Sequence, residues 1–207
     1  MPDNVENKDL EARIIEVAKS LFIEKGFAET SMSEIAAKVG INRPGLHYYF
    51  RTKDKMFEAV FGVIIQSIIP KVQDILSKKD DSISKRIENS IDTYYAVFRE
   101  NPCLPLFILR EMGRDIDYLI ATINVLQAKQ SLDKLIISLQ EEMGQGKLKS
   151  VPLRIIFFTF YSLLIYPFLT KNLSTRIFLE KGETFEDVLA EWKPYIVSQM
   201  ENLLFVK

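Results

Sequence analysis

The chain has 207 residues, with 27 basic and 28 acidic side chains and 47% hydrophobic residues. This length suits a small module joined to a larger one, and the apolar content is enough for a sizeable core. A formal net charge of −1 excludes a generic polyanion binder. The single cysteine, Cys103, excludes an internal disulfide and a thiol-based metal cluster, and we expect neither a metal nor a cofactor. One cysteine, together with a polar N-terminal stretch unlike a secretory signal, predicts a cytoplasmic protein.

Apolar residues recur at helical spacing in the first part of the chain. Gly26 ends the first pattern, and Ser31 with Glu34 forms a capping box that begins a second helix. Gly40 ends that helix, and Pro44 suits the first turn of a third. The three expected helices span about residues 9–25, 31–40 and 44–50. The last two, joined by a glycine-containing turn, form the helix-turn-helix pattern.

The rest of the chain predicts further helices and no strand. They are expected over about residues 54–77, 83–98, 106–113, 117–143, 155–169 and 185–204. Pro70 lies inside the first of these and predicts a kink or a break. The apolar run at 155–169 is shorter than the roughly 20 residues of a transmembrane span, so we expect no membrane insertion. The predicted fold class is all-α, with about nine helices.

Positive charge is concentrated at the end of the helix-turn-helix stretch. Residues 38–55 contain five basic side chains against one acidic side chain, Asp54, whereas residues 1–55 contain nine of each sign. Such an edge suits a specific contact with phosphates better than non-specific coating of a polyanion.

The same stretch carries the side chains that DNA reading requires, some for base edges and others for phosphates. Arg43 can donate to a guanine edge, Gly45 permits close approach, and Lys53 is a candidate phosphate anchor. The free backbone amides at the helix start near Ser31 favour another phosphate. The expected DNA-binding residues are Ser31, Ser33, Arg43, Pro44, Gly45, His47, Tyr48, Tyr49 and Lys53.

The aromatic end of this stretch also has a purely structural interpretation. Leu46 and Phe50 are four residues apart and are expected to face the core. Tyr49 belongs either beside them or on the DNA-facing side. Tyr48 is expected either to be exposed and contact DNA or to pack in the core. His47 is expected either to contact DNA or to be a structural histidine whose hydrogen bonds are satisfied within the protein.

Together these residues resemble the DNA-binding domain of TetR/AcrR-type transcriptional regulators, specifically over about residues 9–62. The matching segments are Leu21-Phe22, Lys25-Gly26-Phe27, Thr30, Ser31-Met32-Ser33-Glu34-Ile35-Ala36, Val39-Gly40-Ile41-Asn42-Arg43-Pro44-Gly45-Leu46-His47-Tyr48-Tyr49-Phe50 and Lys53. Family members typically read Leu-Tyr-Tyr-His-Phe near the end of this stretch, so His47 stands where the phosphate-contacting tyrosine is expected. The resemblance implies a three-helix DNA-binding domain at residues 1–55 and a helical ligand-binding and dimerisation domain at 56–207.

The resemblance further implies a homodimer that binds a near-palindromic double-stranded DNA operator, represses transcription and leaves DNA when it binds a ligand. The dimer would form through helices at about 151–170 and 184–206. Their apolar content independently suggests an interface, and the alternative is that both fill the monomer core. The effector would be a small apolar or amphipathic molecule. Its candidate lining residues, for each of which plain core packing is the alternative, are Phe98, Phe107, Met112, Tyr118, Phe158 and Tyr161.

Two other functions have weaker support in the sequence. An enzyme needs a nucleophile and a base within reach of each other, but the single histidine and single cysteine are far apart in sequence and lie in no motif. We therefore expect no enzymatic activity. The second is a helical ligand- or partner-binding protein without specific DNA binding, against which the intact positive edge with Arg43 and Lys53 argues.

Overall fold

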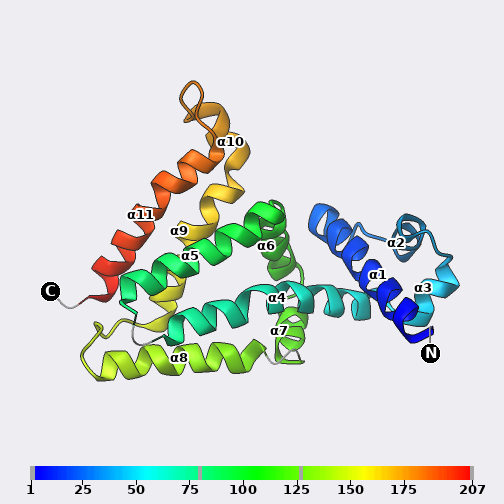
Figure 1. Cartoon of the computed structure of the whole chain (residues 1–207), viewed down its shortest axis with the longest axis horizontal. Coiled ribbons are helices and arrows are strands. Elements are labelled where there is room, and N and C mark those ends of the chain that lie inside the picture. The colour runs from blue at the N-terminus through cyan, green and yellow to red at the C-terminus, as the bar shows by residue number, and fades with distance from the viewer. Residues whose placement is uncertain (1–2, 79–80, 126–127, 206–207) are drawn as a thin grey trace. The chain divides into compact units, whose positions relative to one another are not determined.

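The computed structural model describes residues 3–78, 81–125 and 128–205, and within these ranges the chain forms eleven helices and no strand (Figure 1). The predicted all-α class is confirmed. The chain divides into two compact units. Unit 1 comprises residues 1–67 and 106–128, and unit 2 comprises residues 68–105 and 129–207.

Unit 1 is built around an aromatic cluster. Its helices are α1 (Asp3–Lys25), α2 (Met32–Val39), α3 (Arg43–Tyr49), the first part of α4 (Lys53–Ser77), most of α6 (Leu104–Arg114) and α7 (Ile116–Val125). Phe57 of α4 is fully buried at the centre. Five rings lie 5.2–6.0 Å from its ring centroid, those of Phe22, Phe27, Phe61, Phe107 and Tyr118. Rings at such separations pack favourably edge to face or offset, so this cluster joins α1, α4, α6 and α7.

Unit 2 contains the rest of α4, then α5 (Ile83–Glu100), α8 (Ala128–Gly144), α9 (Leu153–Leu169), α10 (Lys171–Ile177) and α11 (Phe185–Leu204). α11 packs against both α5 and α9 (Figure 1). Phe168 of α9 lies 5.0 Å from the ring of Phe98 and 5.6 Å from that of Tyr95, both on α5. The Trp192 indole donates a hydrogen bond to the Leu163 carbonyl at 2.9 Å, which ties α11 to α9.

The helix count differs from the prediction at two places. The single helix expected over 117–143 is two helices, α7 ending at Val125 and α8 beginning at Ala128, and the residues between lie outside the described ranges. α10 was not predicted because its seven residues are too few to show apolar periodicity. At Pro70 the helix does not break: α4 continues to Ser77, with Ile68 and Val72 buried on either side of the proline. Their burial offsets the backbone hydrogen bond that proline cannot make.

Some helices are apolar enough to cross a membrane by length and composition alone. They are α4, and α9 with α10 taken as a pair bent by 67°. A core helix of a globular protein passes the same test, and Met56, Phe57 and Val60 of α4 are fully buried within the fold. These helices are therefore weak grounds for assigning a membrane span.

Candidate nucleic-acid interface and effector cavity

The third helix, α3, is anchored by its inner face and capped at its start. Leu46 is fully buried and Phe50 is largely buried. The Asn42 side-chain oxygen accepts a hydrogen bond from the Gly45 backbone amide at 2.7 Å, which caps the helix, and Pro44 lies in the first turn. A Cβ atom at Gly45 would lie 3.0 Å from that oxygen, so glycine here leaves room for the cap. Sequence reasoning gave Asn42 no role, although an asparagine just before a proline-containing first turn is a recognisable cap signal.

The outer face of α3 presents polar and aromatic groups. Arg43 and Pro44 are exposed, and Tyr48 is 77% exposed with its ring edge-on to that of Tyr49 at 5.3 Å. The Arg43 Nε donates to His47 Nε2 at 3.3 Å, and His47 Nδ1 lies 3.1 Å from the Arg51 carbonyl oxygen. Because a carbonyl only accepts, Nδ1 carries the proton and Nε2 is the acceptor. His47 in this neutral form therefore orients the Arg43 guanidinium on the exposed face.

The preceding helix, α2, is held at both ends. The Ser31 hydroxyl accepts from the Glu34 backbone amide at 3.1 Å, and the Glu34 carboxylate accepts from Lys25 at 2.5 Å. This hydrogen bond is the main cause of a lowered pKa for Glu34 and a raised pKa for Lys25. At the other end Gly40 has φ +81°, a left-handed conformation that favours glycine, and its amide caps α2. Ser31 and Ser33 are both exposed at the start of this helix.

Lys53 lies elsewhere than on the face of α3. Its ammonium donates to the carbonyl oxygens of Phe27 at 2.8 Å and Thr30 at 3.0 Å, with that of Ala28 at 3.4 Å. It also lies 4.3 Å from the centre of the Phe27 ring. Lys53 therefore ties the start of α4 to the turn between α1 and α2. A phosphate contact by Lys53 would have to share or replace these bonds.

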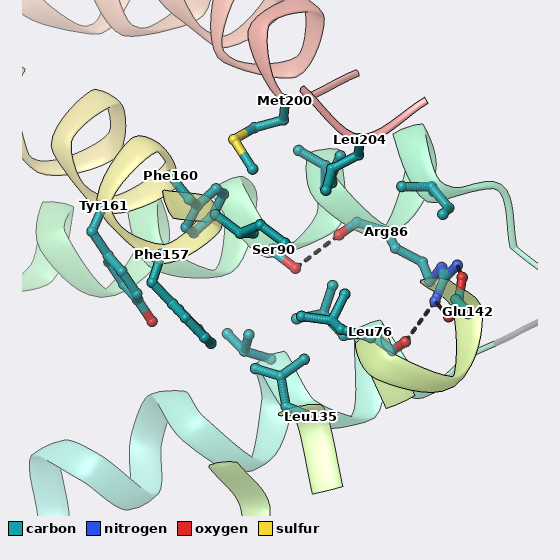
Figure 2. Close-up of a pocket in the computed structure, with 15 residues that line it drawn as sticks. Leu76, Arg86, Ser90, Leu135, Glu142, Phe157, Phe160, Tyr161, Met200 and Leu204 are labelled. Carbon is teal, nitrogen blue, oxygen red and sulfur yellow. Dashed lines mark hydrogen bonds and ion pairs between the residues drawn. The ribbon is translucent and has the colours of Figure 1, made fainter. Parts of the chain in front are cut away.

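Unit 2 contains a partly open cavity of about 70 Å³ (Figure 2). It is lined by residues of α4, α5, α8, α9 and α11, namely Val72, Leu76, Ile83, Arg86, Ile87, Ser90, Leu135, Leu139, Glu142, Ile156, Phe157, Phe160, Tyr161, Met200 and Leu204. Figure 2 shows the aromatic side chains of Phe157, Phe160 and Tyr161 at one end and the ion pair of Arg86 and Glu142 at the other. Its lining is mostly apolar, and the ion pair forms its polar part.

The residues predicted to line an effector pocket are dispersed rather than gathered. Tyr161 lines the cavity, and its hydroxyl lies 2.6 Å from that of Tyr94. Burial raises the pKa of both tyrosines. Phe98 packs in the core of unit 2, whereas Phe107 and Tyr118 belong to the aromatic cluster of unit 1. The other two predicted residues are exposed, Met112 by 45% and Phe158 by 70%. Aromatic side chains at helical spacing do not reveal which of them meet across different helices, so the lining could not be read from the sequence.

Comparisons with known proteins agree on the first part of the chain. Residues 14–60 match the family model of "Bacterial regulatory proteins, tetR family". Among curated relatives, the nucleoid occlusion factor SlmA of Aliivibrio fischeri is 33% identical over 88 residues, 42% of this chain and 44% of that protein. The transcriptional regulator EthR of Mycolicibacterium smegmatis is 26% identical over 94 residues, 45% of this chain and 43% of that protein. The chain thus matches less than half the length of these relatives.

Solved structures extend the likeness in fold to the whole chain. A TetR family transcription regulator from Marinobacter aquaeolei has a TM-score of 0.70 at 14% identity and covers 99% of this chain and 100% of its own. The hemolysin II transcriptional regulator HlyIIR has a TM-score of 0.68 at 20% identity and covers 97% of this chain and 99% of its own. At these identities the likeness shows the fold alone. Residues 14–60 thus match the helix-turn-helix segment of the tetR family model, and the chain as a whole shares the fold of these solved regulators.

Proposed function

We propose that the protein is a cytoplasmic transcriptional regulator that binds a specific double-stranded DNA operator, with residues 1–55 as the DNA-binding domain. The main support for this proposal is the outer face of α3. There Arg43 is exposed and is oriented by a hydrogen bond to His47, while Leu46 on the inner face is buried. An arginine held in this way on a short exposed helix suits contact with base edges in the major groove. Tyr48, exposed by 77%, adds a donor and an apolar ring beside it.

We further propose that the protein acts as a homodimer through α9 and α11, within the predicted ranges 151–170 and 184–206. On α9, four exposed apolar residues at separations of three, eight and three positions share one face: Ile155, Phe158, Tyr166 and Leu169. The opposite face is buried through Ile156, Leu164 and Phe168. On α11, Tyr195 is 55% exposed. An exposed apolar face on a helix that already has a buried face is typical of a subunit interface.

Sedimentation of the purified protein tests this interface. The wild type should sediment as a dimer, and Phe158→Glu should shift it to the monomer because a charge would be buried in the interface. Glu180→Lys, a charge change at an exposed position, serves as the matched control and should remain dimeric. A monomeric wild type, or a dimer unaffected by Phe158→Glu, would refute the proposal.

The remaining part, residues 56–207, would bind a small apolar or amphipathic effector and release the operator, which makes the regulator a repressor. The cavity in unit 2, with its mostly apolar lining, supports this proposal. A ligand that binds the free form more tightly than the DNA-binding form shifts the equilibrium toward the free form. The size of this shift in free energy cannot exceed the difference between the ligand's binding free energies for the two forms.

DNA binding is tested by titrating labelled DNA from the region upstream of the protein's own gene at several salt concentrations, with unrelated DNA of equal length as the control. A sequence-specific regulator should prefer its own region, and the affinity should fall steeply as salt rises because phosphate contacts release counterions. Equal, weak binding to both DNAs would contradict the proposal and favour a partner-binding protein without specific DNA recognition.

The likeness to SlmA, named a nucleoid occlusion factor, favours a second candidate in which the protein acts in nucleoid occlusion and not as a repressor of particular genes. Mapping bound DNA across the genome separates the two candidates. A repressor should occupy a few sites next to regulated genes, whereas an occlusion factor should occupy many sites without changing transcription nearby.

A further inference from the structure

The exposed face of α9 has nearly the same composition in both chain directions. Five exposed residues lie within one arc of the helix, at separations of three, four, four and three positions: Ile155, Phe158, Ser162, Tyr166 and Leu169. Their order is aliphatic, aromatic, small, aromatic and aliphatic. Ile155 and Leu169 at the two ends are 40% and 38% exposed. Phe158 and Tyr166, one turn from the centre on either side, are 70% and 64% exposed. The face is therefore symmetric about Ser162 in chemistry and in exposure.

Ser162, at the centre of this face, suits the point of closest approach between two helices. Its side chain is the smallest of the five, and the distance between packed helices depends on the side chains at their contact. Its hydroxyl donates to the Thr159 carbonyl of the same helix at 3.1 Å. Because that hydrogen bond lies within α9, Ser162 can be covered by another helix without leaving an unpaired donor.

A face of this kind is complementary to a second copy of itself. In a dimer with two-fold symmetry both subunits use the same surface, and each contact occurs twice. Two antiparallel α9 helices with both Ser162 residues at the two-fold axis would place Phe158 against the partner's Tyr166. Ile155 would then lie against the partner's Leu169. Each apolar side chain of the face is covered by one of the same kind, aromatic by aromatic and aliphatic by aliphatic.

The charges at the two ends of α9 favour antiparallel over parallel pairing. Figure 1 shows α10 joining the end of α9 to the start of α11, and residues 170–191 of this end contain three basic and five acidic side chains. At the other end, where α9 begins and α11 finishes, residues 144–154 and 200–205 contain three basic side chains and one acidic side chain. Antiparallel helices place the positive end of one subunit beside the negative end of its partner, whereas parallel helices place like charges together. Opposed helix dipoles favour the same arrangement.

We propose that the exposed face of α9 docks against α9 of a second copy of this chain, antiparallel and in register about Ser162. This inference rests on the proposed homodimer, and it names which residues of the two subunits meet. In a bundle formed by α9 and α11 of both subunits, helices that cross at about 20° stay in contact along the whole face.

Cross-linking measures the register directly because the chain has a single cysteine. Cys103 is exposed, and Cys103→Ser leaves a chain in which every thiol cross-link comes from an introduced cysteine. Ile155→Cys and Leu169→Cys are made separately in this background, one of them with a tag that changes its size, and their mixture is treated with a short bis-maleimide. The two variants should link to each other. Neither should link to its own copy, because the two equivalent positions would lie about 21 Å apart along the helix axis. Lys85→Cys, at an exposed position of α5, is the control and should link to neither.

Charge complementation tests the same register without cysteines. In the antiparallel register position 158 of one subunit faces position 166 of its partner. Phe158→Lys mixed with Tyr166→Glu should therefore form a mixed dimer with one ion pair and one native aromatic contact. Phe158→Lys mixed with Tyr166→Lys is the matched control, in which two like charges face each other. Sedimentation should show the first mixture associating at least about tenfold more tightly than the second, because an unpaired buried charge is costly. In a parallel dimer positions 158 and 166 do not meet, so the two mixtures would associate equally.

The possible failures separate this inference from the homodimer on which it rests. Links within each single cysteine variant, with none between the two, would make the helices parallel and overturn the register while the homodimer stands. A dimeric wild type with no links at either position and with equal association of the two charged mixtures would move the interface away from α9. A monomeric wild type would refute the proposed homodimer itself, and with it this inference.

Discussion

The Glu111 carboxylate accepts a hydrogen bond from the backbone amide of Phe27 at 3.0 Å, although the two residues are 84 positions apart in the chain. Glu111 is 2% exposed, and its other oxygen accepts from Arg114 Nε at 2.6 Å. The Arg114 guanidinium in turn lies 4.2 Å from the centre of the Phe27 ring. Within unit 1, α6 thus holds the turn that follows α1, the same turn that Lys53 holds from α4.

Replacing Glu111 by alanine should lower the free energy of unfolding by about 2–3 kcal/mol, because a buried amide and a guanidinium would lose their acceptor. Urea unfolding followed by circular dichroism measures the change. Glu24→Ala, at an exposed position of α1, is the matched control and should stay within about 0.5 kcal/mol of the wild type. Equal stability of the two variants would show that the bond to Phe27 contributes little.

Lys53→Met should lower the free energy of unfolding by about 1–2 kcal/mol, because the carbonyls of Phe27 and Thr30 lose a charged donor while the aliphatic stem is kept. Lys55→Met is the control, since Lys55 is exposed and pairs with Glu58 three residues along the same helix. If Lys53 also contacts phosphate, its variant should weaken binding to all DNA sequences alike and reduce the salt slope by about one. An unchanged stability would mean that its bonds to the turn are not needed in solution.

Arg43→Ala should weaken operator binding by about 1–3 kcal/mol and relax the preference at particular base pairs, the signature of a base-edge contact. Competition titrations with operators altered one base pair at a time provide the measurement. Arg99→Ala, which removes an exposed arginine of unit 2, should bind as the wild type does. A loss of affinity that is equal for every operator variant would place Arg43 on a phosphate instead of a base.

The same helix offers a separate test through His47. His47→Phe removes the Nε2 acceptor of Arg43, so the guanidinium should lose its fixed orientation and discrimination between operator variants should fall by less than in Arg43→Ala. Discrimination unaffected by His47→Phe would show that the hydrogen bond does not orient Arg43 when DNA is bound.

The burial of Tyr95 predicts how the stability of the protein depends on pH. Burial is the main cause that raises its pKa to about 12, and its hydroxyl has no hydrogen-bond partner among the residues that the structure describes. The unfolded tyrosine has a pKa of about 10, so between pH 10 and 12 the unfolded chain loses the proton that the folded chain keeps. The tyrosine's contribution to stability is therefore complete below pH 10 and is lost as pH rises toward 12.

Tyr95→Phe should remove this part of the pH dependence. At pH 7 its free energy of unfolding should equal that of the wild type or exceed it by up to about 1 kcal/mol, because a buried unpaired hydroxyl is removed and the ring against Phe168 is kept. At pH 11–12 its advantage should grow to about 2 kcal/mol. Parallel stability curves of variant and wild type from pH 7 to 12 would contradict the assigned pKa.

The helices and the helix-turn-helix stretch were predictable because their determinants lie close together in the chain. The Ser31 cap reaches three residues, the Gly40 turn is a property of one residue, and Leu46 and Phe50 occupy neighbouring turns of one face. These signals act within one helix, so they can be read without knowing the fold. The same stretch carried the family resemblance, which the match over residues 14–60 confirms.

Only the tertiary structure could show which side chains bond to residues far away in the sequence. Lys53 bonds to a turn 23–26 residues away, Arg86 to a carboxylate 56 residues away, and Glu111 to an amide 84 residues away. Periodicity shows that a side chain is buried but not what it meets, because that depends on how separate helices pack. The sequence by itself thus determined the all-helical architecture and the polar face of α3, whereas helix packing decided that Lys53 holds a turn and that Arg86 and Glu142 line one end of the cavity.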